Sequence, residues 1–202
     1  TNTATGLAAV ALGSESQAVG DSAFAQGNKA KAVGVSAIAL GEGAVAQLDP
    51  ARPLPTGANA DSNIAIGRGS LANAQTTIAI GNGAIANDED ATVVGDKSQA
   101  GFHATAIGGE VIASGRGSQA FGWQTNATGN LSTALGFRAN AVGGSAITVG
   151  ANTRAEGASA TAIGAGATAN FANSTAIGTG AVTTRADQIV LGRKAVTANG
   201  VT

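Results

Sequence analysis

The sequence predicts an all-β solenoid, a flat two-sided parallel β-roll, and three observations support this prediction. A glycine recurs at every fourteenth position along almost the whole chain, and each interval carries two short runs of alternating small or apolar residues. Large side chains that could fill a globular core are scarce, since aromatic residues make up only 3% of the chain. A fixed period of this kind is the signature of stacked repeats, in which each repeat contacts only its neighbours.

The glycine series defines the repeats, and we number each repeat from its glycine as position 0. Ten of the twelve intervals have the common length of fourteen, while the interval 41–67 is nearly twice as long and the interval 95–108 is one residue short. The glycines of the series are Gly13, Gly27, Gly41, Gly67, Gly81, Gly95, Gly108, Gly122, Gly136, Gly150, Gly164, Gly178 and Gly192. The sequence therefore predicts about 13 coils, with the repeat array over residues 8–197 of a single domain, 1–202.

Each coil is predicted to hold a first strand, a turn, a second strand and a second turn. In the coil 28–41 the first strand has small residues at positions +3 and +5, Ala30 and Ala32. The second has Ile38 at +11 and Leu40 at +13, and position +13 is large and apolar in twelve of thirteen coils. Alternation with period 2 and β-branched residues indicate strands, and Gly or Asn near positions 0 and +7 indicates turns.

The length of the period selects the two-sided roll. Two strands of about five residues and two short turns use up the whole period, whereas a three-sided β-helix needs a longer coil. Thirteen coils at the strand spacing of roughly 4.8 Å make a rod of about 60 Å. No helix is expected.

Position +12 is alanine in ten of thirteen coils, which suggests a second buried face. A strand that is apolar on both faces is buried on both faces. We expect positions +11 and +13 to face the interior, opposite +3 and +5, and the alanine ladder to pack against another chain in an obligate homo-oligomer. The reverse assignment of interior and interface stays open. The candidate interface residues are Ala11, Ala39, Ala65, Ala79, Ala106, Ala134, Ala162 and Ala176.

Position +4, the other face of the first strand, is mixed in polarity and is expected to face solvent. It carries an apolar stripe of Val45, Leu71, Ile85 and Ile112, and exposed apolar patches often mark interaction sites. The alternative is that these are scattered surface aliphatic residues. We expect the stripe to suit an extended ligand.

A second candidate surface is the edge formed by position +1. Trp123 and Phe137 occupy consecutive coils there, and Arg138 follows directly. Trp and Arg are enriched at binding hot spots, so this cluster suits a globular ligand. The alternative is that the aromatic residues cap a turn or pack against a neighbouring subunit.

The repeat departs from its period at two places on the turn between the strands. An insertion over residues 47–63 contains all three prolines, and proline cannot join a strand ladder, so this segment is predicted to be a projecting loop. The short coil loses its residue at the same turn, near Phe102 and His103.

Composition and motifs exclude several classes of function. A net charge of −1 without a basic stripe argues against nucleic acid, and no apolar run is long enough to span a membrane. The chain has no Cys, and its single His103 is interpreted as a solvated turn residue. Asp88, Glu89 and Asp90 are interpreted as an acidic loop. We predict no enzyme activity, no catalytic residue, no metal and no cofactor.

The repeat units identify a family resemblance. Segments 36–41, 62–67 and 173–178 read SAIALG, SNIAIG and NSTAIG. They resemble the head repeat of YadA-like trimeric autotransporter adhesins. The resemblance implies a left-handed parallel β-roll, a tight homotrimer, and a place at the tip of a fibre anchored in the outer membrane of a Gram-negative bacterium. The neck, stalk and membrane anchor of the family are not expected in this segment.

The resemblance also implies a function, namely adhesion to host matrix or host cells. The implied partners are a second and third copy of the chain, and collagen, fibronectin, laminin or a host cell surface. Alternatives are a purely structural spacer of a surface fibre, an ice-binding solenoid and an acyltransferase-type β-solenoid. An acyltransferase of that type needs a six-residue period and a catalytic His, and an ice-binding surface needs paired Thr.

Overall fold

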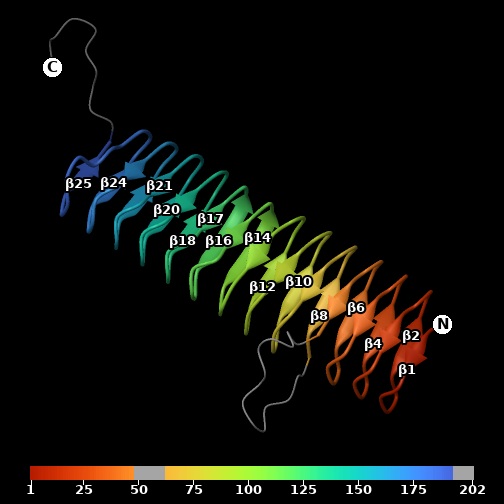
Figure 1. Ribbon diagram of the computed structural model, residues 1–202. Coiled ribbons are helices and arrows are strands. Elements are labelled where there is room, and N and C mark those ends of the chain that lie inside the picture. The colour runs from red at the N-terminus through yellow and green to blue at the C-terminus, as the bar shows by residue number, and fades with distance from the viewer. Residues whose placement is uncertain (48–61, 193–202) are drawn as a thin grey trace, which may run out of the picture.

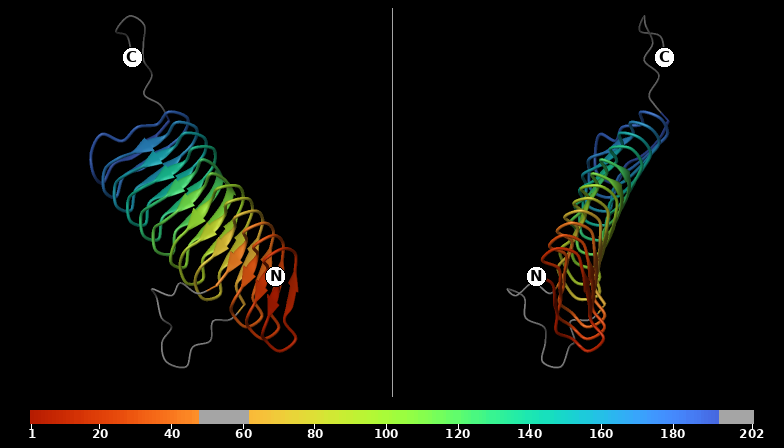
Figure 2. Two further views of the ribbon diagram at one scale, coloured as in Figure 1. Left: turned by 45° about the vertical axis from the view of Figure 1, so that its right-hand side comes forward. Right: turned by 90° about the vertical axis from the view of Figure 1, so that its right-hand side faces the viewer.

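The computed structural model describes residues 1–47 and 62–192, which form an elongated all-β solenoid without helices (Figure 1). Successive coils stack from the N-terminal end of the rod to the C-terminal end, and each coil adds one strand to each of two sheets. In side view the rod is thin, with the two sheets back to back (Figure 2). The predicted two-sided parallel roll is confirmed.

The first sheet has 12 strands of two residues each. They are β1 (Thr3–Ala4), β3 (Gln17–Ala18), β5 (Lys31–Ala32), β7 (Val45–Ala46), β9 (Leu71–Ala72), β11 (Ile85–Ala86), β13 (Gln99–Ala100), β15 (Ile112–Ala113), β17 (Asn126–Ala127), β19 (Asn140–Ala141), β21 (Arg154–Ala155) and β23 (Thr168–Ala169).

The second sheet has 13 strands, most of them three residues long. They are β2 (Val10–Leu12), β4 (Phe24–Gln26), β6 (Ile38–Leu40), β8 (Ile64–Ile66), β10 (Ile78–Ile80), β12 (Thr92–Val94), β14 (Thr105–Gly109), β16 (Gln119–Trp123), β18 (Thr133–Leu135), β20 (Ile147–Val149), β22 (Thr161–Ile163), β24 (Thr175–Ile177) and β25 (Ile189–Leu191).

The strands are shorter than the five residues expected, because each edge of the roll uses more residues in its turn. Positions +2 and +9 adopt a left-handed backbone, as Lys29 (φ 58°) and Ser36 (φ 54°) do in one coil. Twelve strands in the first sheet correspond to about 12 full coils among the described residues, against the 13 predicted. The residues after Gly192, including the last predicted coil, lie outside the described ranges.

Every pairing is parallel and joins equivalent positions of neighbouring coils. Ile38 pairs with Ile64, so the register resumes directly after the insertion, as predicted for a loop at one edge. Across the short coil Ala100 pairs with Ala113, and Val93 pairs with Ala106. Both pairings join residues 13 apart, and the segment that they have in common runs from Ala100 to Ala106. The short coil therefore lacks one residue between β13 and β14, at the predicted turn. The interior of the loop predicted over 47–63 lies outside the described residues.

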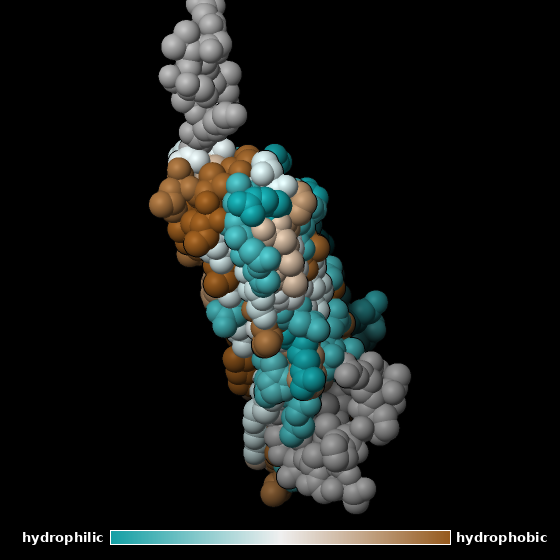
Figure 3. All heavy atoms as spheres, turned by 90° about the vertical axis from the view of Figure 1, so that its left-hand side faces the viewer, coloured by the Kyte–Doolittle hydropathy of each residue, from teal (hydrophilic) through white to brown (hydrophobic). Residues whose placement is uncertain are grey.

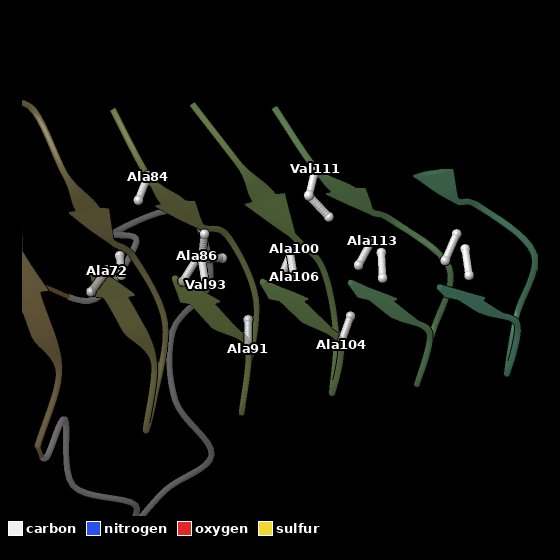
Figure 4. Packing of buried hydrophobic residues seen from close by; sticks show 14 of the residues in the cluster. Ala72, Ala84, Ala86, Ala91, Val93, Ala100, Ala104, Ala106, Val111 and Ala113 are labelled. Atoms are coloured by element: carbon white, nitrogen blue, oxygen red, sulfur yellow. The ribbon is translucent and has the colours of Figure 1, made fainter. Parts of the chain in front are cut away.

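The interior consists of four small side chains from each coil, at positions +3, +5, +10 and +12. In the coil 28–41 these are Ala30, Ala32, Ala37 and Ala39, all 0% exposed. Side chains of both sheets point into the same narrow space (Figure 4). Val93 and Val111 are the largest fully buried apolar residues, which shows how little room the sheets leave.

The structure corrects the face assignment made for the second strand. The alanines expected at a subunit interface point into the roll, while positions +11 and +13 point outward. The reason is steric, because a gap lined on one side by Ala at +3 and +5 has no room for Ile or Leu on the other. Ala11 is partly buried against the core and the other seven are 0% exposed, namely Ala39, Ala65, Ala79, Ala106, Ala134, Ala162 and Ala176.

One +12 position departs from this small apolar core. Thr148 lies between Ala134 and Ala162 in the ladder, and its buried hydroxyl has no hydrogen-bond partner among the described residues. A buried hydroxyl without a partner costs about 1–3 kcal/mol. We expect Thr148→Ala to raise the free energy of unfolding by about 1 kcal/mol in urea titrations.

The control for this prediction is Ser174→Ala. The Ser174 hydroxyl donates to the Phe171 carbonyl oxygen at 2.7 Å and lies 3.0 Å from Thr183 Oγ1. Its removal is expected to lower stability, because both partners lose a bond. A destabilised Thr148→Ala variant would show that the Thr148 hydroxyl has a partner in solution.

Candidate functional site

The outer face of the 13-stranded sheet carries many exposed apolar side chains. Position +13 places a large apolar side chain there in nearly every coil, such as Leu135 at 47% and Ile163 at 37% exposed. Position +11 adds apolar side chains in some coils and Thr or Gln in others. Hydrophobic residues run down one side of the rod and are densest at its C-terminal end (Figure 3). Monomeric proteins rarely expose contiguous apolar patches above a few hundred Å². A face of this extent is typical of a subunit interface.

The outer face of the 12-stranded sheet carries the predicted stripe. Val45 pairs with Leu71, and Leu71 pairs with Ile85, so these three half-buried side chains form a continuous patch across β7, β9 and β11. Ile112 lies on the same face, but Gln99 separates it from Ile85. The structure thus brings together three of the four predicted stripe residues.

The aromatic cluster lies at one edge of the roll. The ring centroids of Trp123 and Phe137 are 5.5 Å apart with an interplanar angle of 41°. The Arg138 guanidinium lies 5.0 Å from the Phe137 ring centroid, and its Nε donates to Gln124 Oε1 at 2.8 Å. Trp123 is 53% exposed. The predicted stacking across consecutive coils is present, on a surface that is open in the single chain.

The acidic loop and His103 are linked by side-chain contacts. Asp90 accepts a hydrogen bond from the Thr76 hydroxyl, and its Oδ2 lies 3.6 Å from His103 Nδ1. The described residues contain no group of three His, Asp or Glu side chains that could hold a metal ion. Within the same residues, no helix has the length and hydrophobicity to cross a membrane.

The structure also shows a hollow on the edge opposite the aromatic cluster, which sequence reasoning missed. Its volume is about 490 Å³, and it spans three coils, the short one and the two that follow it. The lining residues are Phe102, His103, Arg116, Gly117, Asn130 and Leu131. Equivalent positions of successive coils lie side by side, so the recurrence of Phe102, Arg116 and Asn130 at the period of the repeat was the signal that could have found it.

These features define a class of protein. A long, regular rod with exposed apolar side chains on both outer faces and aromatic residues at its edge is typical of elongated interaction modules. Ligands of such a module contact several coils at once, because the same positions recur along the surface.

Comparison with known proteins identifies the family. The YadA head domain repeat matches residues 4–30, 32–47, 56–84, 72–98, 113–139, 127–153 and 155–181, which is more than half of the chain. The chain therefore belongs to the YadA head-repeat family of adhesins. A similar solved structure is the collagen-binding domain of the Yersinia adhesin YadA, with 20% identity, a TM-score of 0.48 and coverage of 96% of this chain and 86% of that one. A comparison with curated proteins found no match.

Proposed function

We propose that this chain is the head of a homotrimeric bacterial surface adhesin that binds extracellular matrix along its side wall. The observation that carries the proposal is the contrast between the two outer faces of the rod. One face carries a large apolar side chain at position +13 in twelve of thirteen coils and suits assembly, and the other carries a short apolar stripe among polar residues. Membership of the YadA head-repeat family supports an adhesin-type function at the cell surface.

Assembly through the 13-stranded sheet follows from the exposure of its outer side chains in the single chain. The ladder formed by positions +11 and +13 is continuous from β6 to β12, where Ile38, Ile64, Ile78 and Thr92 pair in sequence. A parallel, in-phase packing of identical rods would bury this ladder in every subunit and leave the 12-stranded sheet outside. Three copies then display the same stripe, which raises the avidity for a repetitive ligand.

Collagen is the proposed ligand, because an extended fibrous partner can lie along a wall that spans several coils. The stripe of Val45, Leu71 and Ile85 offers it an apolar contact of three coils in each subunit. Fibronectin, laminin and host cells are the other partners to include in the screen. Tip exposure on the fibre follows if this head lies beyond the stalk that the family implies.

The first test replaces the centre of the stripe. We expect the double variant Leu71→Glu/Ile85→Glu to bind immobilised collagen at least tenfold more weakly, because it removes two apolar contacts and adds two charges in each subunit. Solid-phase binding measures the effect, with the mass and melting temperature of the variant as checks on folding. Gln99→Glu adds a charge in the same column and is the matched control.

Trp123→Ala separates the stripe from the aromatic edge. Collagen binding should persist in this variant, whereas a globular ligand that docks on Trp123, Phe137 and Arg138 would be lost. Wild-type collagen affinity in the Leu71/Ile85 double variant would remove the stripe from consideration. If the folded trimer binds none of the matrix proteins or cells, the spacer function is the better interpretation.

A further inference from the structure

The hollow at the edge opposite Trp123 exists because one column of side chains along the roll lacks a side chain at one coil. Position +9 forms a column of turn residues in which His103, Gly117 and Leu131 follow one another in consecutive coils. Gly117 is the only glycine among the thirteen members of this column between Ala8 and Asp187, all of which are described. His103 and Leu131 therefore form two walls with an open position between them.

The backbone conformation at residue 117 does not require a glycine. Its φ is 65°, and non-glycine residues take up the same conformation elsewhere in the column, for example His103 at 52° and Leu131 at 57°. A Cβ at Gly117 would lie 3.0 Å from Leu131 Cδ2 and would enter the space of the hollow. The glycine therefore leaves space that a side chain would occupy.

The neighbouring +8 column places a positively charged side chain, that of Arg116, beside this space. The Arg116 guanidinium lies over the Phe102 ring, 4.6 Å from its centroid, and Arg116 is exposed. It forms no ion pair with any residue in the ranges 1–47 and 62–192. Stacking on the ring holds the guanidinium in one orientation while its N–H groups stay available to an acceptor.

Three other side chains around the hollow, those of Asn130, His103 and Leu131, differ in polarity. Asn130 Oδ1 accepts from the Arg116 backbone N–H at 3.0 Å, which orients the amide and leaves its NH₂ group as a donor. The His103 ring lies 4.0 Å from the Phe102 ring, and Leu131 is 67% exposed at the far wall. A large exposed apolar side chain beside a stacked guanidinium and an oriented amide is typical of a ligand site.

We propose that this hollow binds the acidic sugar unit of a glycan, with the sugar carboxylate paired to Arg116. The planar guanidinium offers two parallel N–H donors that match a carboxylate. Leu131 supplies apolar contact for the C–H face of a sugar ring, and the Asn130 amide donates to a ring hydroxyl. A volume of about 490 Å³ lies within the range of small-molecule sites.

The charges around the hollow favour one negative group on the ligand. Asp90 lies 3.6 Å from His103 on the N-terminal side, and Glu89 precedes Phe102 in the +8 column. A doubly charged phosphate would meet these carboxylates with only Arg116 to balance it. A singly charged carboxylate can pair with Arg116 at the C-terminal side of Phe102. Phe102 and His103 belong to the segment 99–112, which the family repeat leaves unmatched, whereas Arg116 and Asn130 lie in matched segments.

The test uses glucuronic acid and glucose as matched probes, which differ in the carboxylate. Ligand-observed NMR on the intact protein should give millimolar binding of glucuronic acid and at least tenfold weaker binding of glucose. Arg116→Gln should weaken glucuronic acid binding at least tenfold, because it removes the charged guanidinium and its two parallel N–H donors. Gly117→Asn should abolish binding without a change in melting temperature, since Asn tolerates a positive φ and its side chain fills the hollow.

Arg138→Gln is the control, because Arg138 stacks on Phe137 at the opposite edge but already donates to Gln124. This variant should bind glucuronic acid like the wild type. Equal binding of glucose and glucuronic acid, wild-type binding by Arg116→Gln, or no binding of glucuronic acid would each overturn the proposal. Displacement of glucuronic acid by equimolar inorganic phosphate would overturn it in favour of a general anion site. Collagen binding is measured separately, so the two proposals can fail independently.

Discussion

Replacement of Leu135 and Ile163 by lysine is expected to convert the proposed trimer into folded monomers. Both side chains lie on the outer face of the 13-stranded sheet, and they are 47% and 37% exposed in the single chain. Lysine at these positions is therefore compatible with an isolated roll. In the assembly the same lysines become buried without an acceptor, which costs about 3–5 kcal/mol for each uncompensated charge.

The expected change is in molar mass, measured by light scattering after size-exclusion chromatography. The circular dichroism spectrum should keep its β character, because the interior alanines are untouched. Asn140→Lys/Thr168→Lys is the matched control, since both residues lie on the outer face of the 12-stranded sheet in nearby coils. If the Leu135/Ile163 variant keeps the mass and melting temperature of the wild type, the 13-stranded sheet does not form the interface.

The arrangement of the coils could be predicted from the sequence because the fourteen-residue period determines the register between neighbouring strands. Each strand pairs with its equivalent in the next coil, so the glycine series determines which residues meet, including Ile38 with Ile64 across the insertion. The short coil was located correctly for the same reason. Strand lengths were overestimated, because the turns around the left-handed residues at +2 and +9 take up more of each coil than the two short turns that were expected.

The inner and outer faces of the second strand could not be assigned by hydrophobicity alone. Large apolar residues are buried in most proteins, and that rule placed Ile38 and Leu40 inside. In a coil this short the width of the interior is decisive, because the opposite strand brings Ala30 and Ala32. The +10 column held the missing signal, since Ala37 and its equivalents are small and buried like the +12 alanines.

The hollow was not predicted, since it depends on two columns of residues over three consecutive coils. His103 was interpreted as a solvated turn residue, although Asp90 of the preceding coil and the adjacent Phe102 lie against it. Arg116 was not singled out, since its stacking on Phe102 depends on the structure of two neighbouring coils. Glycine is frequent in this chain, and the sequence does not distinguish a glycine that leaves space from one that the backbone requires.

Gly95→Ala is expected to abolish the folded roll or to lower its stability by more than about 4 kcal/mol, which is an exceptional loss for one substitution. The φ of Gly95 is 143°, where residues with a side chain are rarely found, and a Cβ would lie 1.6 Å from the carbonyl oxygen of Gly108 in the next coil. That oxygen belongs to the stacked backbone, so it cannot move without separating the coils. The position-0 glycines recur because the coils approach too closely there for any side chain.

Gly43→Ala is the control that isolates this steric cause. Gly43 also has a positive φ, 64°, but a Cβ there has nothing within 4 Å, and Lys29 holds the equivalent position with a φ of 58°. Its loss should be about 1 kcal/mol, the cost of a left-handed backbone for alanine. Urea unfolding and the yield of folded protein compare the two variants. Similar losses in both would mean that backbone conformation, and not the contact between coils, is what keeps glycine at position 0 of the repeat.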